Sequence, residues 1–178
     1  MLLADAFQQL RWRLFLDLDG VLADFETGVT LRTGKALSSF SSPRALWGRL
    51  AATPHFFEEL PWMPDGELLW ATTCSSSPTI LTGLPRGNWA APQKRRWCAR
   101  ELGEAVPVLT CMSRDKAQVA ARYINPGERP LLIDDREAAQ EPWERAGGLF
   151  ILHRSTEESI RSLYDMIAHE CHTFTSPS

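Results

Sequence analysis

Five short apolar runs, each ending at a polar or small residue, are the feature of this sequence that most restricts its fold. They occupy residues 13–16, 79–81, 106–109, 130–133 and 149–152. The runs do not alternate apolar with polar residues, as a half-exposed strand does. Each run therefore suits a strand that is buried on both faces of a parallel sheet.

Helical patterns lie between and after these runs, over residues 93–102, 115–123, 137–146 and 156–169. Gly103 is a natural end for the first, because glycine readily adopts the left-handed conformation that closes a helix. The last carries apolar residues at spacings of three and four, which give one helical face: Ile160, Leu163, Tyr164 and Ile167. Strands that alternate with helices predict an α/β fold, a Rossmann-like doubly wound parallel sheet.

Residues 25–64 interrupt this alternation. They contain no run that suits a sheet strand, and roughly 40 residues are too many for a plain connection in a compact domain. We expect a small, mainly helical cap insertion at 25–64, placed over one end of the sheet. Residues 1–24 and 65–178 would then form the α/β core.

Composition limits the partners of the chain. With 178 residues and 44% hydrophobic residues, it has the size and make-up of one globular domain. The net charge of −3 provides no basic surface for a duplex, so long nucleic acid is not expected, while a nucleotide-sized ligand is allowed.

The four cysteines contain no C-x-x-C pair, which suits a reducing compartment. Polar residues interrupt positions 1–18, so we expect no signal peptide, no membrane partner and a cytoplasmic location. The oligomeric state stays open.

Chemically active side chains follow four of the five runs. In chain order they are Asp17 and Asp19, then Thr82, then Lys116, then Asp134 and Asp135. Ligands of open α/β sheets bind beyond the carboxyl ends of the strands, so these side chains are expected to converge. Carboxylates packed together repel one another unless a cation lies between them, and a site with only oxygen ligands indicates Mg²⁺.

Each of these features also has an ordinary structural explanation. Asp19-Gly20 is a common turn dipeptide, and Asp134 with Asp135 could cap the following helix. Thr82 with the next glycine could be a turn, and Lys116 could be a solvated lysine. Their occurrence together, in this order and at successive strand ends, favours a functional site over these explanations.

Residues 17–25, DLDGVLADF, resemble the first motif of the haloacid-dehalogenase superfamily and, within it, the 5'(3')-deoxyribonucleotidases. Further segments resemble that family in the same order: 55–60 with Pro64 after it, 94–97, 113–116 and 131–136. The similarity extends from about Leu14 to Arg136. It implies a haloacid-dehalogenase-like core, a cap and Mg²⁺-dependent phosphatase activity.

The resemblance also implies roles for the acidic residues and one lysine. Asp17 would be the nucleophile, forming an aspartyl-phosphate, and also a magnesium ligand. Asp19 would act as acid and then as base, with its backbone carbonyl as a second ligand. Asp135 would be the third protein ligand, and Asp134 would orient Lys116, which neutralises charge on the nucleophile and the phosphate.

Further residues are implied for substrate binding. Thr82 would hold the phosphate beside the Gly83 amide, and Lys94 is an additional phosphate-binding candidate that could equally be a solvated lysine. Phe25 and Trp47 would stack on a base, although Trp47 could instead pack inside the cap. The implied substrate is a small phosphorylated molecule such as a deoxynucleoside monophosphate.

Two departures from the family bear on the substrate. Gly83 follows Thr82 where those nucleotidases carry a hydroxyl residue, and Leu46 precedes Trp47 where an aromatic residue is expected. Another phosphomonoester therefore stays open, such as a sugar phosphate or a polynucleotide 3'-phosphate. A receiver-like phospho-acceptor module is a remote alternative, because receivers are phosphorylated on the third strand and the third run here ends without an acid.

Overall fold

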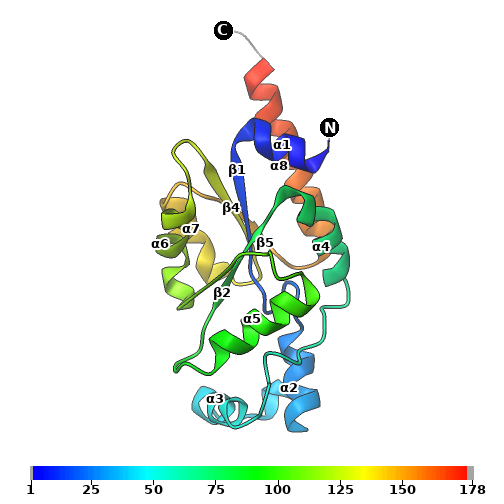
Figure 1. The fold of residues 1–178 in the computed structure, drawn as a ribbon, viewed down its shortest axis with the longest axis vertical. Helices are drawn as coiled ribbons and strands as arrows, with labels where there is room; N and C mark the ends of the chain where they lie inside the picture. The colour runs from blue at the N-terminus through cyan, green and yellow to red at the C-terminus, as the bar shows by residue number, and fades with distance from the viewer. Residues whose placement is uncertain (1, 176–178) are drawn as a thin grey trace.

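A computed structural model describes residues 2–175, and within them the strands form a five-stranded, all-parallel sheet (Figure 1). The strands are β1 (Trp12–Leu16), β2 (Thr79–Gly83), β3 (Val108–Cys111), β4 (Arg129–Asp134) and β5 (Leu149–Leu152). Their order is β3-β2-β1-β4-β5, so β1 is central and pairs with both β2 and β4. This sheet and its helical crossovers confirm the predicted α/β, Rossmann-like doubly wound fold.

The α-helices of the described residues surround this sheet and extend beyond one end of it (Figure 1). They are α1 (Leu3–Leu10), α2 (Phe25–Thr33), α3 (Pro43–Ala51), α4 (Gly66–Thr73), α5 (Ala90–Glu101), α6 (Lys116–Ala120), α7 (Gln140–Arg145) and α8 (Thr156–Thr175). No helix within residues 2–175 is long and apolar enough to cross a membrane.

The central strand separates two apolar cores. Leu14 and Leu16 point into the larger core, to which α1, α4, α5 and α8 contribute side chains. Phe15 points to the opposite face, where it packs edge-on against Trp143 of α7 with ring centroids 5.6 Å apart. All three strand residues are completely buried, as expected for a strand covered on both faces. The continuous apolar pattern of the sequence is therefore explained by helices on both sides of the sheet.

Residues 25–64, which we call the cap segment, contribute no strand to the sheet. Asp24 starts α2 by accepting a hydrogen bond from the Thr27 amide, and Gly34 ends it with a φ of +71°. Ser42 caps α3 in the same way. Both helices lie at the end of the molecule away from the two termini (Figure 1). The division of the chain at residues 25 and 64 stays a prediction.

The ends of the predicted helices shift by several residues in α5, α6, α7 and α8, and three further elements differ from the sequence-based expectation. β3 begins two residues later than predicted, because Val106 is held in a turn by the Gly103 carbonyl and the sheet register starts by pairing Val108 with Ile80. Helix α1 was not predicted, although Leu3, Ala6 and Phe7 form its buried face. Helix α4 was also missed, because it is apolar on most sides.

Candidate functional site

The carboxyl ends of three neighbouring strands assemble the candidate site. Asp17 directly follows the central β1, Thr82 lies near the end of β2, and Asp134 is the last residue of β4. The Asp17 amide still donates to the Ile133 carbonyl at 2.9 Å, which aligns the end of β1 with the end of β4. The predicted convergence of these side chains therefore follows from the strand order.

Asp17, Asp134 and Asp135 each place a carboxylate oxygen within 4.8 Å of the others. Asp17 and Asp134 are buried. Desolvation, and then the charges of Asp17 and Asp134, raise the pKa of Asp135 to about 7. A hard divalent cation would relieve this repulsion, and the oxygen-only donors fit Mg²⁺. Binding of that ion stays a prediction.

Lys116 connects two of these carboxylates. Its ammonium nitrogen lies 2.9 Å from Oδ1 of Asp17 and donates to Oδ2 of Asp134 at 2.6 Å. The Arg136 amide donates to the other oxygen of Asp134, so this carboxylate is fixed from both sides. Burial lowers the pKa of Lys116, but the charges of Asp17 and Asp134 outweigh burial and raise it overall. The lysine therefore remains a cation beside Asp17.

Lys94 on α5 donates hydrogen bonds to a second group of oxygen atoms in the site. Its nitrogen donates to Oδ2 of Asp19 at 2.6 Å, to Oγ1 of Thr82 at 2.9 Å and to the Gly83 carbonyl at 2.7 Å. It also lies 4.5 Å from the centroid of the Phe57 ring. The lysine is completely buried, not solvated, and its three N–H groups are engaged by the protein. Direct contact of Lys94 with a phosphate would require exchange of one of these bonds.

Asp19 faces the cavity with 26% of its side chain exposed. Burial raises the pKa of this carboxyl group, Lys94 opposes that effect, and the charge of Asp17 adds to it. Its Oδ1 atom is buried and has no hydrogen-bond partner among the described residues. A carboxyl group with a raised pKa and an unused oxygen is suited to hold and release a proton.

Gly20 is required by the packing of the site. It has a φ of +77°, and a Cβ atom at this position would lie 2.3 Å from Oδ2 of Asp135. The Asp19-Gly20 turn therefore does more than reverse the chain, since the absent side chain leaves room for the Asp135 carboxylate.

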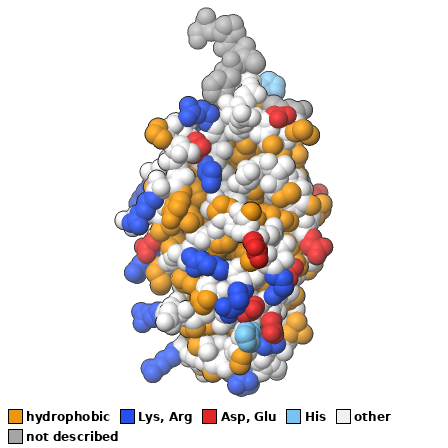
Figure 2. All heavy atoms as spheres, in the orientation of Figure 1, with side chains coloured by type: hydrophobic (Ala, Val, Ile, Leu, Met, Phe, Trp, Pro, Cys, Tyr) orange, Lys and Arg blue, Asp and Glu red, His pale blue; other side chains and the backbone are white. Residues whose placement is uncertain are grey.

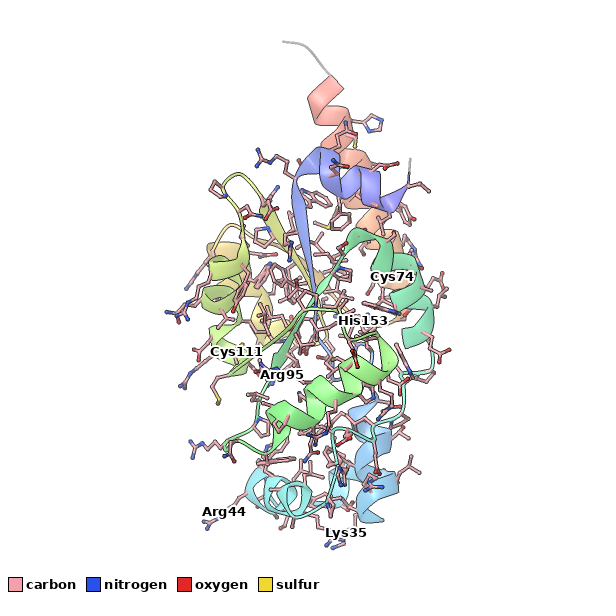
Figure 3. The ribbon with its side chains drawn as sticks, viewed as in Figure 1. Lys35, Arg44, Cys74, Arg95, Cys111 and His153 are labelled. Atoms are coloured by element: carbon pink, nitrogen blue, oxygen red, sulfur yellow. The ribbon has the colours of Figure 1, made fainter. Side chains whose placement is uncertain are left out.

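Asp17, Asp19 and Asp135 lie on the wall of a cavity of about 1480 Å³ that extends under the cap segment, whereas Asp134 is completely buried behind them. Phe25 and Trp47 also line it, with ring centroids 5.7 Å apart, and Trp47 is 36% exposed. His153, labelled in Figure 3, contributes from the loop after β5. The structure thus brings the predicted aromatic residues into the same cavity as Asp17 and Asp19.

Two features of the cavity were missed by the sequence reasoning. Phe57 packs against the buried ammonium of Lys94, a contact between distant segments that no local pattern reveals. Besides Arg44 of the cap segment, four arginines that follow strands line the cavity: Arg86, Arg114, Arg136 and Arg154. Each comes two or three residues after a strand, so their repeated spacing was a signal available in the sequence.

Comparisons with known proteins support the fold. No protein-family model matches the chain, and no curated protein matches it. A crystal structure of a hydrolase from Streptococcus pneumoniae TIGR4 is similar, with a TM-score of 0.50 and 17% sequence identity. The similarity covers 86% of this chain and 97% of the other. A likeness at this identity shows the shared fold, and the site itself has to indicate the chemistry.

Proposed function

We propose that this protein is a magnesium-dependent phosphomonoester hydrolase with Asp17 as its nucleophile. The observation that carries the proposal is the position of the buried Asp17 carboxylate, 2.9 Å from the Lys116 ammonium and clustered with Asp134 and Asp135. Attack on a phosphate requires a carboxylate oxygen and cationic groups that balance the charge of the phosphate. This site offers the carboxylate, the lysine and the ligands for a cation.

The reaction would take place in two steps. In the first, a carboxylate oxygen of Asp17 bonds to phosphorus, the bond from phosphorus to the substrate oxygen breaks, and Asp19 protonates that leaving oxygen. In the second, water bonds to phosphorus, Asp19 accepts the proton of the water, and the bond between Asp17 and phosphorus breaks. Inorganic phosphate leaves and both carboxyl groups return to their starting states. The raised pKa of Asp19 favours the protonated form that the first step needs.

The residues that would hold Mg²⁺ are Asp17 and Asp135 through their carboxylates and Asp19 through its backbone carbonyl. When bound, the ion supplies positive charge to the phosphate oxygens. Lys116 adds a second cation beside Asp17. The Thr82 hydroxyl accepts a hydrogen bond from Lys94 and is completely buried, so it would reach a phosphate oxygen only if the loop after β2 opened around the substrate.

The similar Streptococcus pneumoniae protein is named a hydrolase, which agrees with a hydrolytic reaction. For the substrate we propose a small nucleotide, as in the 5'(3')-deoxyribonucleotidases that the sequence resembles. Phe25 and Trp47 support this choice, because aromatic side chains on the cavity wall can stack on a base. The second candidate is another phosphomonoester, a sugar phosphate or a 3'-phosphorylated oligonucleotide, which the size of the cavity would admit.

Replacement of the nucleophile tests the proposal. Asp17→Asn should lower the magnesium-dependent hydrolysis of p-nitrophenyl phosphate by about 10³-fold or more, because an amide cannot form the aspartyl-phosphate. The matched control is Asp165→Asn, the same change at an exposed position of α8. Acid quenching during turnover, followed by peptide mass spectrometry, should find the phosphoryl group on Asp17. Undiminished hydrolysis by Asp17→Asn would exclude this residue as the nucleophile.

A further inference from the structure

An arginine follows every strand of the sheet except the central one. Arg86 comes three residues after β2, Arg114 three after β3, Arg136 two after β4 and Arg154 two after β5. All four line the cavity that contains Asp17, and we call them the strand-end arginines. Because the strand order is β3-β2-β1-β4-β5, two of them follow strands on each side of β1. The loop after the central strand thus supplies Asp17 and Asp19 without an arginine, and the loop after each of the four other strands supplies a guanidinium group.

Two of these cations have no role in the fold. Arg86 and Arg154 are exposed, and their side chains have neither an ion pair nor a hydrogen bond with any described residue. The charged side chains over α5, in contrast, have partners of opposite charge. Figure 2 shows acidic and basic side chains intermixed there, and Arg96, for example, pairs with Glu58 at 2.7 Å. The guanidinium groups of Arg86 and Arg154 therefore remain available to a ligand.

The other two strand-end arginines are held only weakly. Arg136 donates to the Ser113 hydroxyl at 3.3 Å. Arg114 lies 3.6 Å from Asp115, with 83% of its side chain exposed. Exposed pairs of this kind contribute at most about 1 kcal/mol, so an anion in the cavity could replace these partners at little cost.

The cavity has different chemistry on its two sides. Toward the cap segment it is lined by Asp24 and Glu26 beside the aromatic rings of Phe25 and Trp47. Arg44 also belongs to the lining, but its side chain extends at the outer edge of the cap segment (Figure 3). Aromatic rings can stack on a base, and Asp24 and Glu26 have no strand-end arginine beside them, so the cap side suits the base of a nucleotide. The sheet side, with the strand-end arginines, suits an anion.

The size of the cavity also exceeds what one phosphate and one ring require. Its volume of about 1480 Å³ is larger than the roughly 300–1,000 Å³ typical of sites for small ligands. A nucleoside monophosphate would place its only phosphate at Asp17 and leave Arg86 and Arg154 without a partner.

We propose that the substrate is a nucleotide that carries a second phosphate group besides the monoester transferred to Asp17. Because neighbouring strands lie about 4.8 Å apart, one phosphate cannot contact all four arginines. The unpaired Arg86 and Arg154, one on each side of β1, supply the N–H donors for this second phosphate, and Arg114 and Arg136 add positive charge to the cavity. This inference rests on the proposed function and specifies its substrate class. The second phosphate could be a terminal group, as in a nucleoside 3',5'-bisphosphate, or the diester of a short 3'-phosphorylated oligonucleotide.

Kinetics with three substrates in Mg²⁺ test this inference: deoxyadenosine 5'-monophosphate, deoxyadenosine 3',5'-bisphosphate and a 3'-phosphorylated deoxydinucleotide. The second phosphate should raise kcat/KM by about tenfold or more, which corresponds to about 1.4 kcal/mol. A gain with the bisphosphate alone identifies a terminal phosphate, and a gain with the dinucleotide identifies a chain end. Equal kcat/KM for all three overturns the inference.

The double variant R86A/R154A tests the arginines themselves. It should remove most of the gain from the second phosphate and change kcat/KM for the monophosphate by less than about threefold, since its effect is confined to the added group. The control is R145A/R161A, which removes the same charge from α7 and α8 outside the cavity. Equal losses in the two double variants would show unspecific attraction and contradict the inference.

Equilibrium binding separates this inference from the proposed function. Calorimetry with Asp17→Asn, which should not turn over, measures the Kd of the monophosphate and the bisphosphate directly. If the wild-type protein hydrolyses no phosphomonoester, the proposed function fails, yet tighter binding of the bisphosphate that depends on Arg86 and Arg154 would still support the role of the arginines. Hydrolysis without any preference in binding would leave the proposed function standing and refute the second-phosphate site.

Discussion

The ammonium group of Lys94 lies 2.6 Å from Oδ2 of Asp19 and is itself completely buried. The same nitrogen bonds to Thr82 and to the Gly83 carbonyl, so one side chain on α5 joins the end of β2 to the loop after β1. Burying an amino group is favourable only when its charge and donors are satisfied, as they are here. The position of Asp19, the proposed acid, therefore depends on Lys94.

Lys94→Gln should lower both activity and stability. Glutamine is uncharged, one bond shorter and carries two N–H groups in place of three, so Asp19 would lose its ion pair and the three acceptors could not all be satisfied. Breaking a buried ion pair costs about 3–5 kcal/mol, and the exposed fraction of Asp19 places the expected loss of unfolding free energy at the lower end of that range. Denaturant unfolding and assay of p-nitrophenyl phosphate hydrolysis measure the two effects, and kcat should fall more than KM rises if Lys94 positions the acid.

Arg95→Gln is the matched control for this change. Arg95 is the next residue of α5, it is exposed, and it donates to the Thr110 hydroxyl at 3.2 Å (Figure 3). Its loss should alter the unfolding free energy by less than about 1 kcal/mol and leave kcat unchanged. Similar losses in the two variants would contradict a special role for the buried lysine.

Asp135→Asn should weaken the affinity for Mg²⁺. The change removes one of three clustered carboxylates, and an amide oxygen carries no net charge to attract the cation. Calorimetric titration should show a dissociation constant raised by about tenfold or more, and the magnesium concentration for half-maximal activity should rise in parallel. Asp165→Asn serves as the control on α8, and an unchanged affinity in Asp135→Asn would remove this residue from the metal site.

Gly20→Ala tests the contact between the turn after β1 and the Asp135 carboxylate. A new Cβ would lie 2.3 Å from Oδ2 of Asp135, so the carboxylate has to move. We expect a loss of about 1 kcal/mol in unfolding free energy from the positive φ alone, together with weaker Mg²⁺ binding from the displaced carboxylate.

Gly34→Ala isolates the backbone component of that change. Gly34 has a φ of +71°, close to the +77° of Gly20, but a Cβ there would meet no atom within 4 Å. It should therefore lose similar stability and keep its full Mg²⁺ affinity. If both variants bound Mg²⁺ equally well, the space left by Gly20 would have no part in the metal site.

The sequence was sufficient for the sheet and for the acids at its edge. β5 has the predicted bounds, Leu149–Leu152, because a continuous apolar run has few alternatives to a buried strand. The positions of Asp17 and Asp135 follow in turn from parallel strands ending at one edge. These properties depend on residues that are close in the chain or on the strand order, and both can be inferred from a pattern.

Long-range contacts were not predictable in this way. The contact of Lys94 with Asp19 joins residues 75 positions apart and depends on how α5 is rotated against the sheet. In a basic run of the sequence, Lys94 cannot be distinguished from its neighbour Arg95, yet one is buried and the other exposed. The same holds for Phe57, whose contact with Lys94 is set by the packing of the cap segment.

His153 gives the protein a stability that depends on pH. The residue is buried, its Nδ1 lies 2.8 Å from the Ser159 hydroxyl, and its amide donates to the Asp134 carbonyl. Burial lowers its pKa, while the nearby charges of Asp65 and Glu158 oppose that effect. In the unfolded chain a histidine has a pKa of about 6.5. The unfolded state therefore binds more protons than the folded state below about pH 7, and the contribution of His153 to stability falls as the pH decreases.

A comparison of wild type with His153→Gln isolates this contribution. The pKa of Asp135 is raised to about 7, so Asp135 titrates in the same range with the opposite sign, but it does so in both proteins and cancels in the difference. Denaturant unfolding between about pH 5 and 8 should show that the stability advantage of wild type over the variant is largest near pH 8 and shrinks toward pH 5. The proton spectrum of the His153 imidazole should confirm a pKa below the unfolded value. An advantage that stays constant, or grows as the pH falls, would mean that His153 is not held in its neutral form by burial.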